Sequence, residues 1–399
     1  MNHLYCSLCR KKYGLKEILF RCPKCNEPLE VVCELPKTNK DDLTRRRENS
    51  LWRYKDFFPL KGKIKKISLN EGGTPLIKSF NLGRKIGLRS LYLKNEILNP
   101  TGSFKDRGTS IGISWALHLG FDKVGTVSTG NMAVSVGAYA ARAGIKSFIL
   151  VSVGIPKNKL GHISTFNPLI LEVEGDYGQL YYESLKIGKK KGIYFINSDN
   201  PFRVEGQKTV AFEICEKFSF DVPDFVFIPV SAGGNFFAIY KGFKEFYNLG
   251  FIPKIPELIG VQAEGCSPIA NAFKKGKKSI ERVKNSQTIA HAIANPFPPS
   301  GNRVLRIARE NKGKIVSVSD KEILNAQKLL SKYEGIFCQP ASATSIASVI
   351  KLKKEGYLKG GEVIVSILTG NGLNDPSVFE YYKPNLKKAN LNELDSLLN

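Results

Sequence analysis

The amino-acid sequence predicts an α/β fold, in which helices cover both faces of parallel β-sheets. From Leu91 onward, short apolar runs alternate with helical patterns along most of the chain, and strand–helix alternation of this length is typical of parallel sheets. The chain has 399 residues, of which 42% are apolar and 24% charged, as in ordinary globular proteins. This length indicates two or three domains, with a ligand in the cleft at the carboxyl ends of the strands.

The first segment carries a cysteine array. Two C-x₂-C pairs, separated by twelve residues, are formed by Cys6, Cys9, Cys22 and Cys25. Because structural zinc takes four thiolates in a tetrahedron, we expect a zinc-ribbon-like segment over residues 1–35. Reduced thiols without metal are the alternative. If this segment is peripheral, turnover should survive its loss.

The main body is expected over residues 71–385, as two α/β subdomains of which the smaller covers roughly 105–200. Residues 36–70 are interpreted as a linker with a docking helix, and residues 386–399 as a C-terminal tail. The expected strands, after one at 91–93, are 123–127, 147–151, 169–173, 193–196, 225–230, 258–263, 315–318 and 363–368, and the expected helices are 104–119, 132–143, 177–190, 203–218, 236–249 and 321–333.

The stretch at residues 99–108, Asn-Pro-Thr-Gly-Ser-Phe-Lys-Asp-Arg-Gly, joins the strand at 91–93 to the following helix. At such a junction, backbone N–H groups and the positive end of the helix dipole point into the cleft. The dipole disfavours a cation there, so we interpret Lys105, beside Arg107, as an amine kept for chemistry, with its pKa lowered by its surroundings. Composition alone would favour a solvated surface lysine, and it is the ten-residue stretch as a whole that favours the chemical role.

Other polar groups also follow strands. Ser128, Thr129 and Asn131 open the helix after the strand at 123–127 and can hold an anion or an aromatic oxygen. Small residues at 231–235 can wrap a phosphate, and Thr369 offers a hydroxyl after the last strand. Ordinary helix caps and turns are the alternative for each.

A further set, Asn197, Ser198 and Arg203, supplies an amide, a hydroxyl and a guanidinium just before a helix. Such groups suit a phosphate dianion, while a surface ion pair is the alternative for Arg203. The chain carries 60 Lys and Arg against 36 Asp and Glu, a net charge of +24. These basic residues are spread out without aromatic interleaving, so we expect an anionic small-molecule substrate and no nucleic-acid partner.

Nothing in the sequence predicts a membrane partner. No run of eighteen apolar residues occurs, and the first residues lack the basic and apolar regions of a signal peptide. We therefore expect a cytoplasmic protein.

Five stretches, taken together and in order, resemble the threonine synthases, which are fold-type-II pyridoxal-phosphate enzymes with a tryptophan-synthase-β-like fold. The similarity extends from the cysteine pairs to Glu334-Gly335-Ile336-Phe337 and Pro340-Ala341-Ser342-Ala343. The five stretches are Glu71-Gly72-Gly73-Thr74-Pro75-Leu76, the Lys105 stretch, Ser128-Thr129-Gly130-Asn131, residues 197–209 and Leu368-Thr369-Gly370.

The resemblance implies a lyase of threonine biosynthesis that converts O-phospho-L-homoserine and water to L-threonine and phosphate by γ-elimination and β-hydration. Lys105 would hold pyridoxal 5'-phosphate as a Schiff base, Asn131 would contact the ring oxygen, and Thr369 would bind the pyridine nitrogen. Substrate contacts would come from Ser128, Thr129, Asn197, Ser198 and Arg203, assisted by Lys157 and Lys159. The cofactor phosphate would lie against Ser231, Ala232, Gly233, Gly234 and Asn235.

The sequence departs from the usual pattern of this family at Met132, at Ser231-Ala232, at Asn371 and at residues 295–299. These departures leave open a β-elimination or β-replacement on a phosphoserine-like or hydroxyamino acid, as in cysteate synthase or threonine ammonia-lyase. A paralogue that has lost catalysis and binds nucleic acid is the third reading, against which the intact Lys105 counts. Enzymes of this resemblance are often dimers, so a homodimer is open.

Overall fold

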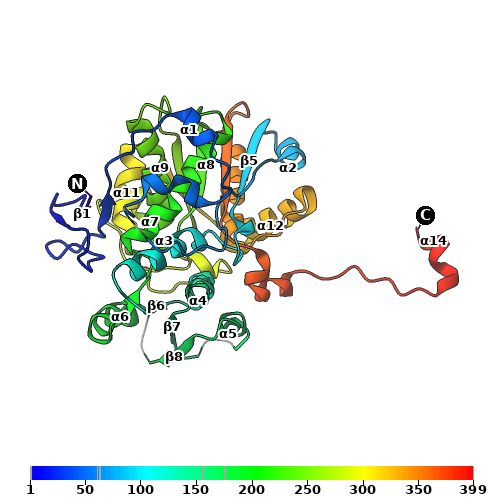
Figure 1. Cartoon of the computed structure of the whole chain (residues 1–399). Coiled ribbons are helices and arrows are strands. Elements are labelled where there is room, and N and C mark those ends of the chain that lie inside the picture. The colour runs from blue at the N-terminus through cyan, green and yellow to red at the C-terminus, as the bar shows by residue number, and fades with distance from the viewer. Residues whose placement is uncertain (1, 61, 63, 155–156, 175–176, 399) are drawn as a thin grey trace.

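We describe the protein from a computed structural model covering residues 2–60, 62, 64–154, 157–174 and 177–398, without the side chains of 157–159, 177, 178 and 395. Two sheets form the body (Figure 1). The larger has the order β12 (Lys314–Val318), β11 (Glu257–Ala263), β10 (Phe225–Pro229), β13 (Val363–Leu368), β5 (Ser90–Asn95), β4 (Leu76–Lys78), and the smaller has the order β8 (Leu169–Val173), β7 (Lys146–Ser152), β6 (Lys123–Val127), β9 (Tyr194–Phe195).

Strand pairing within both sheets is parallel, except for the antiparallel pair β4 and β5 at one edge. The predicted α/β class with parallel sheets is therefore confirmed. The helices of the body are α2 (Phe80–Lys85), α3 (Lys105–His118), α4 (Asn131–Ala143), α5 (Lys157–Ser164), α6 (Tyr177–Lys191), α7 (Pro201–Gln207), α8 (Thr209–Lys217), α9 (Gly234–Asn248), α10 (Pro268–Lys274), α11 (Gly301–Glu310), α12 (Asp320–Glu334) and α13 (Pro340–Lys354).

The helix expected at 203–218 is two helices, α7 and α8, which meet at Lys208. The Lys208 ammonium is fully buried and forms ion pairs with Glu205 at 2.7 Å and Glu245 at 2.8 Å. It also donates a hydrogen bond to the Phe57 carbonyl at 2.8 Å. A buried charge needs such partners, so this junction is an internal anchor, which a pattern of apolar positions does not reveal.

The N-terminal ribbon has three short antiparallel strands in the order β2 (Lys12–Gly14), β1 (His3–Tyr5), β3 (Glu30–Val32). It packs against the body, where Lys241 of α9 donates a hydrogen bond to the Val31 carbonyl. The following segment contains α1 (Lys40–Thr44) and the 3₁₀ helix η1 (Leu51–Phe57). Trp52 of η1 is buried, and its Nε1 donates to Glu71 at 3.1 Å and to Ser110 at 3.0 Å.

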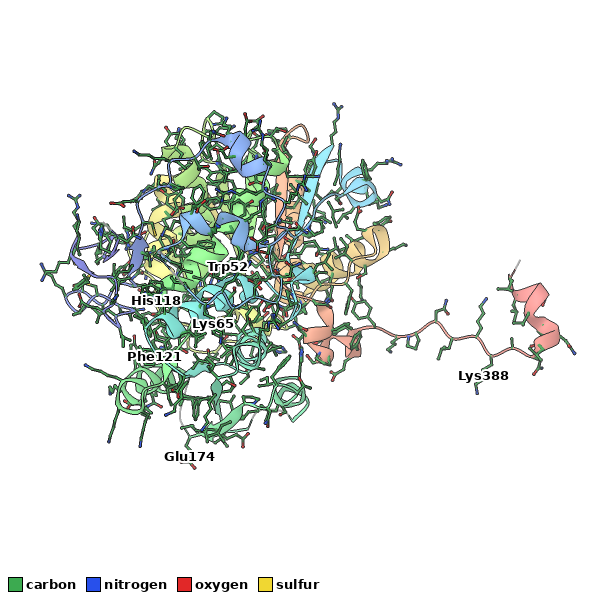
Figure 2. The ribbon with its side chains drawn as sticks, in the orientation of Figure 1. Trp52, Lys65, His118, Phe121, Glu174 and Lys388 are labelled. Atoms are coloured by element: carbon green, nitrogen blue, oxygen red, sulfur yellow. The ribbon has the colours of Figure 1, made fainter. Side chains whose placement is uncertain are left out.

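At the other end, the chain leaves the body as an extended segment that carries Lys388 (Figure 2) and ends in η6 (Leu391–Glu393) and α14 (Leu394–Leu398). Among the described residues, no helix is long and apolar enough to cross a membrane.

Candidate active site

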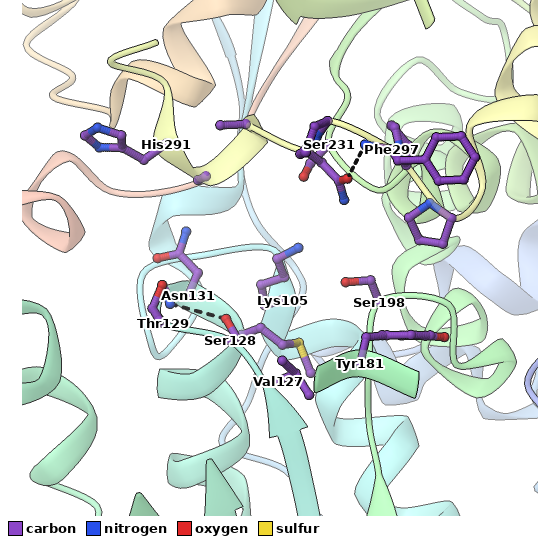
Figure 3. A pocket seen from close by; sticks show the side chains of 18 of the residues that line it. Lys105, Val127, Ser128, Thr129, Asn131, Tyr181, Ser198, Ser231, His291 and Phe297 are labelled. Atoms are coloured by element: carbon purple, nitrogen blue, oxygen red, sulfur yellow. Dashed lines mark hydrogen bonds between the residues drawn. The ribbon is translucent and has the colours of Figure 1, made fainter. Parts of the chain in front are cut away.

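The polar motifs that follow the strands meet in one place (Figure 3). A cavity of about 950 Å³ is lined by Lys105 from the start of α3, by Ser128 to Asn131 at the start of α4, and by Ser198 and Ser231. A smaller cavity of about 40 Å³ adjoins it and shares Lys105, Asn131, Ser198 and Ser231. The site therefore lies between the two sheets, at the carboxyl ends of their strands, where α/β folds bind ligands.

Lys105 is an unusual lysine. Burial, followed by the positive charge of Arg203, lowers the pKa of its amine to about 7 from an ordinary 10.5. Its Nζ lies 4.4 Å from the centroid of the Phe104 ring, and among the described residues no side chain accepts a hydrogen bond from it. An amine with this pKa is partly neutral near pH 7, so it can act as a nucleophile and carry protons.

Close helix packing brings Arg203 to Lys105. A Cβ on Gly206 of α7 would lie 1.9 Å from the Arg107 carbonyl of α3. Only glycine therefore allows the two helices to cross at this distance. The cation that lowers the lysine pKa comes from α7, whereas Arg107, its neighbour in the sequence, points into a different network.

The loop before Lys105 is held rigidly by its own side chains. Asp106 is buried and accepts hydrogen bonds from the Thr101 backbone at 2.7 Å, the Thr101 hydroxyl at 2.6 Å and Ser135 at 2.7 Å. Burial raises the pKa of this carboxyl to about 7, although the hydrogen bonds from Thr101 and Ser135 oppose the rise. These contacts fix the turn from which Lys105 projects.

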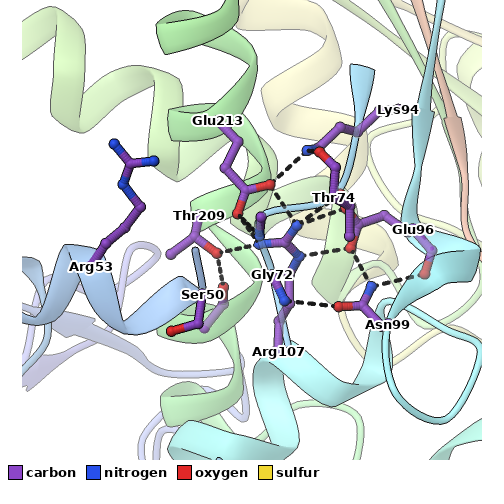
Figure 4. Close-up of polar contacts among 12 residues, drawn as sticks. Ser50, Arg53, Gly72, Thr74, Lys94, Glu96, Asn99, Arg107, Thr209 and Glu213 are labelled. Carbon is purple, nitrogen blue, oxygen red and sulfur yellow. Dashed lines mark hydrogen bonds and ion pairs between the residues drawn. The ribbon is translucent and has the colours of Figure 1, made fainter. Parts of the chain in front are cut away.

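Arg107 anchors the same helix end on the opposite side (Figure 4). Its guanidinium is fully buried and forms ion pairs with Glu96 and Glu213, each at 2.6 Å. Lys94 also pairs with Glu213, at 2.6 Å. Removing one partner from such a buried set typically destabilises a protein by about 3–5 kcal/mol, so this network holds β5, α3 and α8 in register.

The small cavity contains every residue that the sequence assigns to the cofactor. Gly233 has φ +93°, and a Cβ there would lie 2.9 Å from Val304, so a side chain would fill the loop. Asn235 is buried, and within the described residues neither atom of its amide has a hydrogen-bond partner. A glycine turn at the start of a long helix, with an unpaired buried amide, fits a phosphate group. The lining from this loop comprises Ser231, Ala232, Gly233, Gly234 and Asn235, joined by Lys105, Asn131 and Thr369.

Three residues to which the sequence assigns no role in the site, Gln339, Ser342 and Asn374, hold the side chains of Asn131 and Thr369. Gln339 accepts a hydrogen bond from the Asn131 amide at 3.2 Å, and the Ser342 hydroxyl lies 2.9 Å from that of Thr369. Asn374 donates to the other side of Asn131 at 3.0 Å. The run at 340–343 appears in the sequence only as part of the resemblance, so nothing there indicates these contacts.

Two of the three residues predicted to bind phosphate, Ser198 and Arg203, line the small cavity. Ser198 also lines the large cavity. Asn197 does not line either cavity: its side-chain Oδ1 accepts a hydrogen bond from the Val127 backbone N–H at 3.0 Å, and its side-chain Nδ2 donates to the Ser184 hydroxyl at 3.0 Å. Its side chain thus joins β6 to α6, and its predicted direct contact with the substrate stays a prediction. Lys157 and Lys159 have side chains outside the described part.

The large cavity has a wall that the sequence does not predict. Arg21, Cys25 and Asn26 of the N-terminal ribbon line it, together with Met132 and residues 294–299. The ribbon is therefore not peripheral. More basic than acidic side chains face this cavity, with Lys105, Arg21, Lys278, Arg282 and Arg306 against Glu27 and Asp375. Such a lining favours an anionic ligand.

Comparison with known proteins agrees with this site. A family model described as pyridoxal-phosphate dependent enzyme matches residues 67–370, and the chain belongs to this family. Maize serine racemase has the same fold, with a TM-score of 0.65 and 21% identity over 77% of this chain and 91% of that one. Threonine deaminase isoform 2 of Solanum lycopersicum gives a TM-score of 0.64 and 20% identity, over 87% of this chain and 98% of that chain.

Within this family, the chain groups with the threonine synthases. It is 44% identical to the threonine synthase of Methanocaldococcus jannaschii over 93% of this chain and 92% of that protein. The threonine synthase of Methanosarcina acetivorans is 39% identical over 94% of this chain and 93% of that protein. Both matches extend over nearly the whole chain.

Proposed function

We propose that this protein is a lyase that converts O-phospho-L-homoserine and water to L-threonine and phosphate. The observation that carries the proposal is that a lysine amine with a pKa of about 7 and the Arg203 guanidinium line the same small cavity. One group can transfer protons and the other can bind a phosphate dianion. The identity to threonine synthases over nearly the whole chain supports it.

The small cavity is the proposed site of pyridoxal phosphate. Residues 231–235 would hold its phosphate, Thr369 and Asn131 would contact its ring, and Lys105 would bind it covalently. When bound, this cofactor stabilises negative charge on the carbons of the substrate. The unpaired Asn235 amide and the glycine turn beside it support this assignment.

The chain's own groups have the following roles in this proposal. The freed Lys105 amine moves protons at Cα, Cβ and Cγ of the substrate, since phosphate leaves from Cγ and water adds at Cβ. Arg203 and Ser198 bind the leaving phosphate, and Ser128 and Thr129 face the rest of the substrate. Asn197 supports this set from behind, through β6 and α6.

An incubation with O-phospho-L-homoserine, and a matched one with O-phospho-L-serine, tests the proposal. We expect threonine and phosphate in equal amounts from the first and little phosphate from the second. Faster phosphate release from phosphoserine would favour the β-elimination or β-replacement reading that Met132 and residues 295–299 leave open.

We also propose that Cys6, Cys9, Cys22 and Cys25 hold one structural zinc ion. All four sulfur atoms lie within 4.8 Å of one another, with 3.4 Å between Cys6 and Cys25 and 3.5 Å between Cys9 and Cys22. Tetrahedral zinc with bonds of about 2.3 Å separates its sulfur ligands by about 3.8 Å. Four thiolates leave no position for a water ligand, so the role would be structural.

Elemental analysis tests the zinc site. The purified protein should contain one zinc per chain, and the Cys22→Ser, Cys25→Ser double variant should contain none. Cys33→Ser is the matched control, because Cys33 lies on the same segment outside the cluster, and it should keep its zinc. Equal zinc in the wild type and the double variant would contradict the assignment.

The cytoplasmic location and the homodimer expected from the sequence stay predictions.

A further inference from the structure

One side chain connects the N-terminal ribbon to the substrate cavity. Arg21 directly precedes Cys22, and its Nη1 lies 2.9 Å from the Asp199 carboxylate and 3.4 Å from the Pro299 carbonyl. Its Nε donates to the Asn26 side chain at 2.9 Å, and its Nη2 to the Asn26 carbonyl. The guanidinium therefore connects Asn26, which follows the second cysteine pair, to two segments of the body that line the cavity.

Asp199, the ion-pair partner of Arg21, lies next to residues of the proposed phosphate site. Asp199 has a fully buried carboxylate, which also accepts a hydrogen bond from the Tyr181 hydroxyl. In the sequence it directly follows Ser198, which lines both cavities. The next residue, Asn200, caps α7 by accepting a hydrogen bond from the Phe202 backbone at 3.0 Å.

The first turn of α7 completes this connection. Arg203 lies in that turn and donates a hydrogen bond to the Asn197 carbonyl at 3.0 Å. Residues 197–203 thus form a compact segment, and Arg21 of the N-terminal ribbon holds this segment at Asp199. A buried carboxylate that loses its cation must rearrange, take up a proton or admit water. Rearrangement or entry of water would shift the segment that carries Ser198 and Arg203.

We propose that Arg21 is a positioning residue of the active site. Through Asp199 it fixes residues 197–203 in the geometry that binds the substrate phosphate. By this contact the N-terminal ribbon contributes to substrate binding. The inference rests on the proposed function, since it names the support of the proposed phosphate site.

Steady-state kinetics of Arg21→Ala test the inference. We expect the KM for O-phospho-L-homoserine to rise about tenfold, while kcat changes much less. A moderate interaction energy between two residues in contact corresponds to a change in affinity of about this size. The dissociation constant of inorganic phosphate, followed through the absorbance of the bound cofactor, should rise by a similar factor. Hydrogen exchange of peptides covering 197–203 should become faster, whereas the cofactor spectrum and the zinc content stay as in the wild type.

Three further variants separate positioning from general damage. Arg21→Lys keeps the charge and should recover part of the lost affinity. Asp199→Asn is nearly isosteric and should reproduce the effect, after which adding Arg21→Ala should change little, because the two residues act as one unit. Lys12→Ala removes an exposed charge from the same ribbon, away from the cavity, and should behave as the wild type.

Several outcomes would overturn the inference. One is an unchanged KM and phosphate affinity in Arg21→Ala. Another is a raised KM with wild-type hydrogen exchange at 197–203, which would indicate that Arg21 touches the substrate itself. If the wild type made no threonine, the proposed reaction would be wrong, and the phosphate dissociation constants would still decide the role of Arg21. If Arg21→Ala failed to fold, Asp199→Asn would carry the same comparison.

Discussion

Replacing Lys105 with alanine should reduce turnover by at least about a thousandfold, because a positioned acid–base group alone contributes about 10²- to 10⁴-fold and this residue is also the proposed covalent anchor of the cofactor. In the wild type, borohydride followed by peptide mass spectrometry should fix the cofactor on Lys105. Lys321→Ala, which removes an exposed lysine at the start of α12, is the matched control and should keep full activity. An adduct on another lysine would contradict the assignment.

The pH dependence of cofactor binding follows from the same lysine. Because burial and Arg203 lower the pKa of its amine to about 7, the neutral, reactive form dominates above that pH. The cofactor-free protein should therefore bind pyridoxal phosphate faster as the pH rises through about 7, and the rate should level off near pH 8. An ordinary lysine would keep gaining rate towards 10.5.

The second large effect is expected at Arg203. Arg203→Lys keeps the charge but loses the planar pair of donors, which is not a conservative change at a phosphate site. Losing a charge-assisted hydrogen bond costs about 1.5–3 kcal/mol, or roughly ten- to a hundredfold in kcat/KM. Arg203→Ala should be worse, and it should also move the pH midpoint of cofactor binding upward, because a positive charge next to Lys105 is removed.

A control variant and the absorbance of the cofactor distinguish a loss of phosphate binding in the Arg203 variants from general damage to the protein. Arg84→Lys changes an exposed arginine of α2 that lines neither cavity, and it should leave kcat/KM unchanged. The absorbance of the bound cofactor should stay normal in Arg203→Lys, since the cofactor phosphate is assigned to residues 231–235. Full efficiency of Arg203→Lys on phosphohomoserine would point to a substrate without a phosphate.

Much of the fold is predictable because its strands and outer helices have regular patterns. The strands at 123–127, 169–173 and 363–368 have the predicted bounds. The sequence pattern does not predict the helix α13 (Pro340–Lys354), because this helix is buried for most of its length and contains many serines and threonines. Their hydroxyls bond to carbonyls of the same helix, as Thr344 does to Ala341, so no polar face alternates with an apolar one.

The candidate site was predictable only where its residues follow strands. This position after a strand points to Lys105, Asn131 and Thr369, and the structure brings the three residues to one cavity. Gln339 lies on a connection without such a signal. Arg21 contacts Asp199, which is far along the chain, and no local pattern encodes a contact of that range.

The central claim is that carbon–oxygen cleavage at Cγ and addition of water at Cβ occur in this cavity. Incubating the protein with O-phospho-L-homoserine in water labelled with ¹⁸O tests it directly. Phosphate that leaves from Cγ keeps its bridging oxygen, so we predict that the label appears in the hydroxyl of threonine and is absent from the released phosphate. Labelled phosphate with unlabelled homoserine would mean simple hydrolysis at phosphorus, and would contradict the proposed function.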